Sequence, residues 1–235
     1  MYRLVIGSLL LALAQGCIII DDTEENGDAS CPTRAEGDGA CFAVTAVCPP
    51  DAVTYDVIVQ PVGVTGAFDP DTFDCGVGSS ILVDPGTYDI RVEATTAEGD
   101  ILFGSAAAVD QEVADLDDVP LTFEFPTGQG FFWVNWTILE GETEVSCEDI
   151  GAASLEVQSM LTGEGSPDTD LLPCVYGGWQ TRPLDLGEYD VRIALLDDGG
   201  AVIGQTDPIL TDLTDDSVLV PLPDITFALE PPAAR

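Results

Sequence analysis

Two basic residue types are missing from this chain of 235 residues, which contains no lysine and no histidine. Without histidine there is no Ser-His-Asp or Cys-His nucleophile pair, and no imidazole ligand for zinc or haem. Without lysine there is no Schiff base and no phosphate-binding lysine. What remains is carboxylate chemistry, either as in glycosidases or as oxygen ligands for hard cations such as Ca²⁺.

Positive charge of any kind is scarce, because six arginines stand against 43 aspartates and glutamates, a formal net charge of −37. A surface of this charge repels the phosphates of nucleic acids and anionic lipid headgroups, so no nucleic-acid partner is expected. Cations, basic proteins and neutral glycans are compatible ligands. A simpler interpretation is that the acids keep an extracellular protein soluble.

The small and apolar run from Leu4 to Ala14 has eleven residues, which suits a signal peptide and is too short to span a bilayer. The residues that follow, Leu13-Ala14-Gln15-Gly16-Cys17, resemble the lipobox of bacterial lipoproteins. The resemblance implies a signal peptide of residues 1–16 that is cleaved before Cys17. It also implies a diacylglycerol on the Cys17 sulfur, which makes the membrane a partner through a lipid anchor.

A competing interpretation is the A-x-A site Ala12-Leu13-Ala14, which would give a soluble secreted protein that starts at Gln15. The chain has seven cysteines, and secreted proteins rarely leave a thiol free. Lipidation of Cys17 leaves six cysteines to pair, which favours the anchor. Residues 17–40 are then an acidic, disordered tether, and Ile18 after the lipidated cysteine favours the outer membrane.

An internal repeat sets the domain organisation. Cys48 and Cys75 map onto Cys147 and Cys174 with a shift of 99 residues, and residues 84–92 map onto residues 185–193 with a shift of 101. Shifts this constant over the length of a domain indicate a duplication. We therefore expect one domain over residues 41–127 and a second over residues 128–235.

Both copies have the period-2 pattern of half-buried strands. Tyr88, Ile90, Val92 and Ala94 alternate with polar residues, and residues 189–195 repeat the pattern. Turn-forming clusters separate short runs of this kind, and none has a helical period. The predicted fold is all-β, with two tandem antiparallel β-sandwich domains.

One element occurs in both copies and resembles the tyrosine corner of immunoglobulin-like sandwiches; its residues are Asp84, Gly86 and Tyr88, and Asp185, Gly187 and Tyr189. The resemblance implies that each tyrosine hydroxyl bonds back to the preceding turn. Both glycines are expected at positive φ. Transthyretin-like and carboxypeptidase-regulatory-like domains have a similar turn, so the strand order stays open.

The duplication also predicts the disulfides, because equivalent cysteines should make equivalent bonds. Cys48 pairs with Cys75, and Cys147 pairs with Cys174. Cys31 and Cys41 are left to each other, and this bond would fix the end of the tether to the first strand.

Two kinds of candidate site stand out. Asp69, Asp71 and Asp74 form an acidic loop that is a weak candidate for Ca²⁺, with Asp168 and Asp170 at a similar place in the second copy; a solvated acidic loop is the alternative. The aromatic side chains Phe131, Trp133 and Trp179 could form an exposed platform for a glycan or protein, or be buried in the protein. For Phe131 and Trp133 we expect burial between the domains.

The predicted protein is therefore a cell-envelope lipoprotein with a binding or structural role and a protein or glycan ligand. A soluble secreted binding protein is the alternative location, and a carboxylate-based hydrolase is the alternative from another class. A hydrolase should have a deep cleft with converging acids and a carboxyl of raised pKa. A binding module should have flat sandwich faces and exposed loops.

Overall fold

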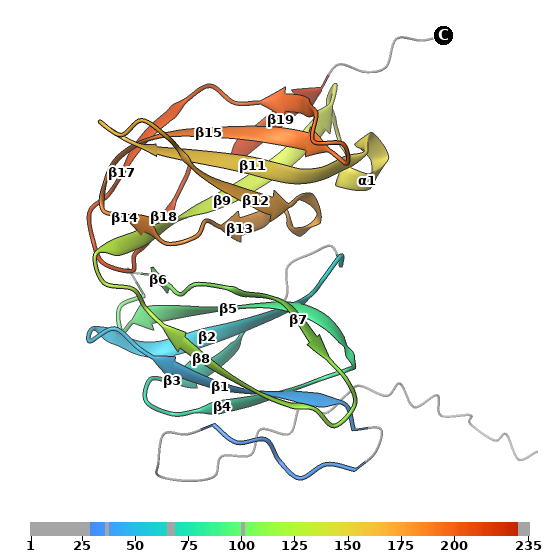
Figure 1. The fold of residues 1–235 in the computed structure, drawn as a ribbon, viewed down its shortest axis with the longest axis vertical. Helices are drawn as coiled ribbons and strands as arrows, with labels where there is room; N and C mark the ends of the chain where they lie inside the picture. Colours follow the sequence, from blue (N-terminus) through green and yellow to red (C-terminus); the bar gives the residue numbers. More distant parts are fainter. Residues whose placement is uncertain (1–28, 36–37, 65–68, 100–101, 230–235) are drawn as a thin grey trace, which may run out of the picture.

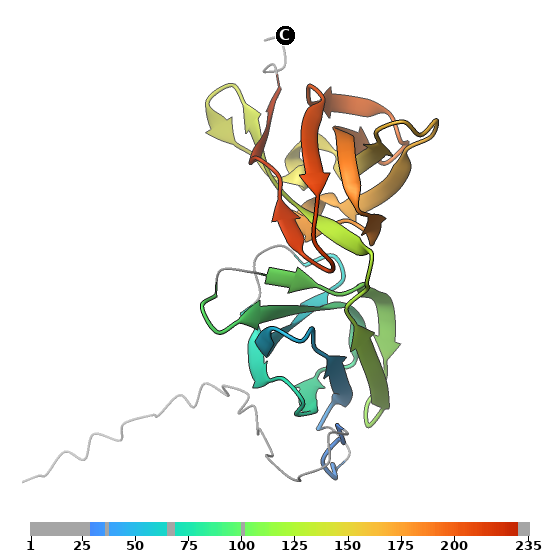
Figure 2. The same cartoon turned by 90° about the vertical axis from the view of Figure 1, so that its left-hand side faces the viewer.

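The computed structural model describes residues 29–35, 38–64, 69–99 and 102–229. These residues form two lobes stacked along the long axis of the molecule, one for each repeat (Figure 1). A view from the side shows the same two lobes, joined by the chain between β8 and β9 (Figure 2). The signal segment and Cys17 lie outside the described residues. Within the described residues, no helix has the length and hydropathy needed to cross a bilayer.

The first lobe is built from β-strands whose alternating side chains are buried on one face. They are β1 (Ala40–Val47), β2 (Ala52–Pro61), β3 (Asp71–Asp74), β4 (Ser79–Val83), β5 (Gly86–Thr96), β6 (Leu102–Gly104), β7 (Ala108–Val113) and β8 (Asp118–Glu124).

The second lobe follows the same plan as the first. Its elements are β9 (Gln129–Glu140), β10 (Thr143–Glu144), α1 (Cys147–Ile150), β11 (Ala152–Leu161), β12 (Asp168–Pro173), the 3₁₀ turn η1 (Cys174–Tyr176), β13 (Gly178–Gln180), β14 (Leu184–Asp185), β15 (Gly187–Asp197), β16 (Val202–Gln205), β17 (Ile209–Leu213), β18 (Leu219–Pro221) and β19 (Ile225–Leu229). Two short helical turns and the short strand β10 are added, and β13 and β14, and β18 and β19, lie in the places of β4 and β8.

Each lobe contains two sheets of matching connectivity. In the first, β4-β1-β8 form one sheet, and β3-β2-β5-β6 form the other, with β7 also on β5. In the second, β12-β11-β15-β16 with β17 correspond to the latter sheet, and β9 pairs with β10, β13, β14, β18 and β19. The predicted all-β class with tandem β-sandwiches is confirmed.

The first strand of each lobe pairs in parallel with the end of the same repeat, where the sequence predicted antiparallel sheets. β1 pairs with β8 in parallel from Cys41 and Asp118 onward, and β9 pairs in parallel with β18 and β19. The last strand of each repeat thus returns beside the first. This contact joins the two ends of a repeat, so no local pattern in the sequence indicates its direction.

Each lobe has its own hydrophobic core. In the first, Tyr88, Ile90 and Val92 of β5 lie against Phe42 of β1, and all four are buried. In the second, the equivalent residues of β15 lie against Phe132 of β9. The buried side chains therefore form two separate clusters, one in each repeat.

Three disulfides join the six cysteines of the described residues in the predicted pairs. Cys48–Cys75 connects the end of β1 to the turn after β3, which belongs to the other sheet. Cys147–Cys174 connects α1 to η1 at the equivalent place. Each of these two bonds closes a loop of 27 residues, worth about 3–4 kcal/mol on the chain-entropy model.

Candidate binding groove between the two domains

The repeated tyrosines both make the bond that the resemblance implied. The Tyr88 hydroxyl donates to the Asp84 carbonyl at 2.8 Å, and the Tyr189 hydroxyl donates to the Asp185 carbonyl at 2.6 Å. Both tyrosines are buried. Burial, together with the charge of Asp185, raises the pKa of Tyr189 to about 12. The neutral hydroxyl is the form that the fold stabilises in each corner.

The two turn glycines differ, which corrects the expectation of positive φ at both. Gly187 has φ +156°, and a Cβ there would lie 2.5 Å from Leu161 Cδ1. Gly86 is not at positive φ, and its added Cβ would make an ordinary contact, 3.4 Å from Tyr88 Cε2. Only the second corner therefore requires glycine for its backbone.

The chain before β1 is fixed to the first domain at two points. Cys31 is bonded to Cys41 on β1. The Arg34 guanidinium pairs with the Asp118 carboxylate and donates to the Gly39 carbonyl at 3.0 Å. These contacts hold the described N-terminal end at the pole of the first domain that lies away from the second (Figure 1).

The carboxylates of the acidic loops do not lie at metal-ligand spacing. Asp69 and Asp74 are exposed, and the structure does not bring them together with Asp71 on the scale of a metal site. Asp168 and Asp170 of the second copy pair instead with Arg182, at 3.8 and 3.0 Å. Within the described ranges, the one group at metal-ligand spacing is Cys31, Cys41 and Asp118, and its two sulfurs are already bonded to each other.

The outward face of β5 meets the second domain. Asp89 is only 5% exposed, and its carboxylate accepts a bond from the Tyr176 hydroxyl of η1 at 2.8 Å. The other Asp89 oxygen accepts from the Asp110 backbone N–H at 2.8 Å. Burial, followed by the bond to this carboxylate, raises the pKa of Tyr176 well above its usual range. A buried charge is thus satisfied by partners from both domains.

Arg91 lies two residues further along β5 and is the central contact of the interface. Its guanidinium carbon is 4.8 Å from the ring centres of both Trp133 on β9 and Trp179 on β13. Arg91 Nε also donates to Glu93 at 3.0 Å, and the two side chains are 12% and 14% exposed. A desolvated cation between aromatic faces is worth about 2 kcal/mol for each good contact.

Backbone contacts continue the interface along β6. The Gly104 N–H donates to the Ser217 carbonyl at 2.8 Å, and Phe103 forms an isolated antiparallel bridge with Val218. The Gln180 side chain donates to the Ser105 carbonyl. Polar and backbone groups of both domains are thus bonded across the junction, and these bonds fix how one domain lies against the other.

The aromatic residues Phe131 and Trp133, at the start of the second repeat, pack in the interface between the two domains. Phe131 is fully buried, and a Cβ on Gly104 of the first domain would lie 3.0 Å from its ring. Trp133 is half-buried beneath Arg91. Trp179 is 4% exposed, so the interpretation as an exposed aromatic is wrong.

The sequence did not indicate that Asp89, Arg91 and Tyr176 belong to an interface. For Asp89 and Arg91 the reason is that β15 carries the same Asp-x-Arg pattern on an open face.

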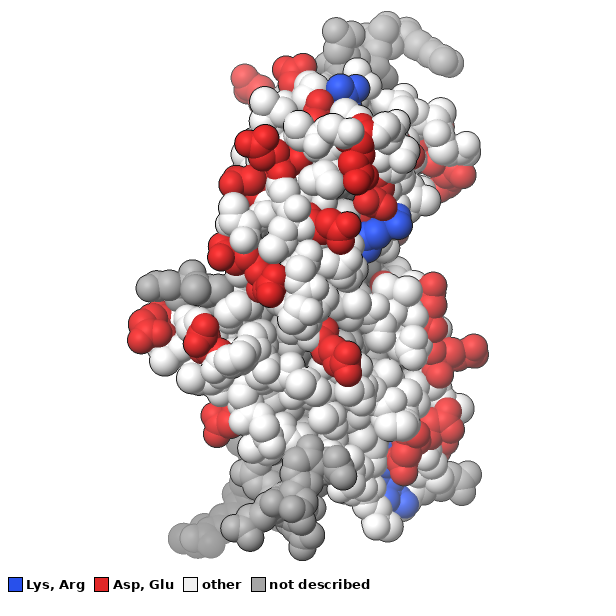
Figure 3. Space-filling view, turned by 60° about the vertical axis from the view of Figure 1, so that its left-hand side comes forward, with Lys and Arg blue, Asp and Glu red and all other residues white. Residues whose placement is uncertain are grey.

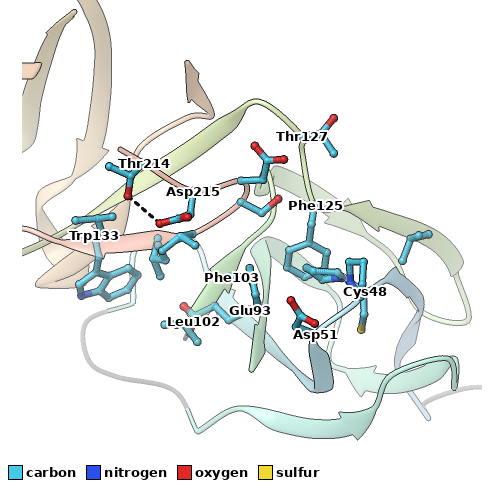
Figure 4. Close-up of a pocket in the computed structure, with 18 of the residues that line it drawn as sticks. Cys48, Asp51, Glu93, Leu102, Phe103, Phe125, Thr127, Trp133, Thr214 and Asp215 are labelled. Atoms are coloured by element: carbon cyan, nitrogen blue, oxygen red, sulfur yellow. Dashed lines mark hydrogen bonds between the residues drawn. The ribbon is translucent and has the colours of Figure 1, made fainter. Parts of the chain in front are cut away.

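A groove of about 1330 Å³ opens beside these contacts. Its apolar lining includes Phe103 and Phe125 of the first domain and Trp133 of the second. Figure 4 shows Asp51 next to Cys48 on one wall, and Asp215 bonded to Thr214 on the other. The groove therefore combines an apolar surface from both domains with acids at its edges.

A raised carboxyl pKa, which the general acid of a hydrolase needs, occurs at two of the described residues. Burial raises the pKa of Asp71 on β3 and of Asp170 on β12, and neither residue lines the groove. Catalytic general acids are tuned in this direction where they contact the substrate.

No protein-family model and no curated protein matches the chain. Similar solved structures include the minor pilin of Streptococcus agalactiae, at 11% identity over 84% of this chain and 98% of that one, with a TM-score of 0.29. The fimbrial anchor protein Mfa2 of Porphyromonas gingivalis matches at 11% identity over 72% and 82%, also with a TM-score of 0.29. At TM-scores this low, the likeness carries no inference about what the present chain does.

Proposed function

We propose that this protein is a cell-envelope lipoprotein of the outer membrane, anchored through Cys17, that uses its two domains as one binding unit. The observation that carries the binding role is the groove between the domains. Its walls come from both repeats, and the contacts of Asp89 and Arg91 hold those walls in register. A preorganised groove binds without the cost of ordering its own walls.

Three disulfides support a location outside the cytosol, because cytosolic thiols are kept reduced. The anchor segment would enter at the pole of the first domain that Cys31 and Arg34 fix. The second domain would then be the membrane-distal one, with the groove part-way along the molecule. The high density of acids on both domains keeps this surface apart from anionic headgroups (Figure 3).

The anchor is tested with Cys17→Ser in the producing cells, followed by membrane fractionation. We expect the variant to leave the membrane fraction, because acyl chains at about 0.8 kcal/mol per buried CH₂ supply the attachment. A matched variant, Ser30→Ala, alters the tether without touching the anchor and should stay in the membrane fraction. Mass spectrometry of an unmodified chain that starts at Gln15 would contradict the anchor and favour the secreted alternative.

A further inference from the structure

Three carboxylates at the groove have no cationic partner. Asp51, Asp215 and Asp216 all line it, and all three are exposed. The arginines of the described residues are already paired with other acids: Arg34 with Asp118, Arg91 with Glu93, Arg182 with Asp168 and Asp170, and Arg192 with Asp190. The chain contains no lysine, so the described structure has no further cation to bring to this site.

We propose that the groove binds an extended segment of a basic protein, an inference that rests on the binding role proposed above. Apolar side chains of the segment pack on Phe125 and on the exposed side chain of Val47, which both line the groove. Arginine or lysine side chains at either end pair with Asp51 on the first domain and with Asp215 and Asp216 on the second. The groove favours a cationic ligand, because the only cation in its lining, Arg91, already contacts Glu93 and two tryptophans and does not neutralise the three aspartates.

The dimensions of the groove favour a polypeptide over a single ion or amine. Its volume of about 1330 Å³ exceeds what a metal ion or one amino group fills. Among the described residues, the groove acids do not converge at metal-ligand spacing. An extended peptide has the reach to contact acids on both walls at once.

The aromatic side chains argue against a glycan. Sugar rings stack on open aromatic faces, and here Arg91 lies over the ring of Trp133, while Phe103 is 7% exposed. These carboxylates, which lack a cationic partner, would gain little from a neutral glycan but would gain charge-assisted bonds from a guanidinium or ammonium group. The observations therefore favour a basic protein segment.

The test uses the full-length protein in neutral detergent and a fluorescent decapeptide of alternating arginine and valine. Binding is measured by fluorescence anisotropy at physiological ionic strength, where general attraction to an acidic surface is screened. The groove variant is Asp51→Asn/Asp215→Asn/Asp216→Asn. The matched control, Asp198→Asn/Asp207→Asn/Asp224→Asn, removes the same charge at exposed positions that do not line the groove.

We expect the groove variant to weaken binding by about tenfold or more, and the control to change it by less than about twofold. Thr127→Arg, which places a cation in the groove from an exposed lining position, should also abolish binding. Tryptophan fluorescence of each variant checks that the second domain and the interface remain folded, because all three tryptophans belong to that domain.

Equal weakening by the two triple variants would overturn the proposal, since it would mean that only the overall charge attracts the peptide. Failure of the wild-type protein to bind the peptide would also overturn it, as would equal affinity for a control decapeptide of alternating glutamate and valine. Membrane fractionation of the same variants gives an independent result. A protein that stays membrane-bound but binds no peptide contradicts the groove proposal and leaves the lipid anchor intact.

Discussion

Strands β5 and β15 carry almost the same residues but lie in opposite surroundings. Asp89 and Arg91 on β5 face the second domain, where Asp89 is 5% and the Arg91 side chain 12% exposed. On β15, Arg192 pairs with Asp190 at 3.4 Å, and its side chain is 58% exposed. Equivalent Asp and Arg residues thus build an interface in one repeat and form an ion pair at the surface of the other. The two repeats have the same fold, but contact between them buries the outward face of β5 and leaves that of β15 open.

The largest loss of unfolding free energy should come from changes to the tyrosine corner, which both repeats contain. Replacing Tyr88 or Tyr189 by alanine opens a cavity beside Phe42 or Phe132 and should cost about 3–5 kcal/mol of unfolding free energy in each domain. Phenylalanine at either position removes only the hydroxyl bond and should cost about 1 kcal/mol.

Urea unfolding measures both tyrosine effects with the disulfides intact. Tryptophan fluorescence follows the second domain and its interface with the first, because Trp133, Trp136 and Trp179 all lie in the second domain and two of them contact Arg91. Far-ultraviolet circular dichroism follows both domains. If either alanine variant unfolds at the wild-type urea midpoint, the tyrosine corner does not stabilise that repeat.

The next largest loss of stability should distinguish β5 from β15, because the equivalent arginines of these strands lie in different surroundings. Arg91→Ala removes two cation–π contacts and leaves Glu93 without its partner in a poorly solvated place, so we expect a loss of about 2–4 kcal/mol. Arg192→Ala is the matched control at the equivalent position, and an exposed pair should contribute about 0.5 kcal/mol or less.

Arg91→Lys sharpens this comparison, because lysine keeps the charge but lacks the planar group that stacks between the rings. We expect a tryptophan emission shift for both Arg91 variants, and separation of the unfolding of the two domains into two transitions. If Arg91→Ala and Arg192→Ala have the same small effect, the interface does not hold the domains together.

The smallest effect concerns the turns before the two strands. Gly187→Ala must hold an L-residue at φ +156° and displace Leu161, so we expect a loss of about 1–3 kcal/mol. Gly86→Ala has room and no positive φ, and should change stability by about 0.5 kcal/mol in either direction. The same urea titrations compare them, and equal losses would show that the two turns have the same backbone requirement.

The sequence by itself determined much of each domain. The constant spacing of Cys48 and Cys75 against Cys147 and Cys174 predicted two equivalent bonds that the structure contains. The alternation along residues 88–94 and 189–195 predicted strands, which the structure extends to residues 86–96 and 187–197, because side chains of successive strand residues point to opposite faces whatever the surroundings. The repeated Asp-x-Gly-x-Tyr element indicated the tyrosine corners, because the tyrosine and its acceptor carbonyl are only four residues apart.

Only the tertiary structure decided which outward faces are buried. Asp89, Arg91 and Trp179 became interface residues, and Asp51 and Asp215 came to line one groove, through the position of one domain against the other. The parallel return of β8 beside β1 is likewise a contact between distant segments. A strand pattern states only that two faces differ. Which face meets solvent depends on contacts over long sequence separations, and these have no local period to reveal them.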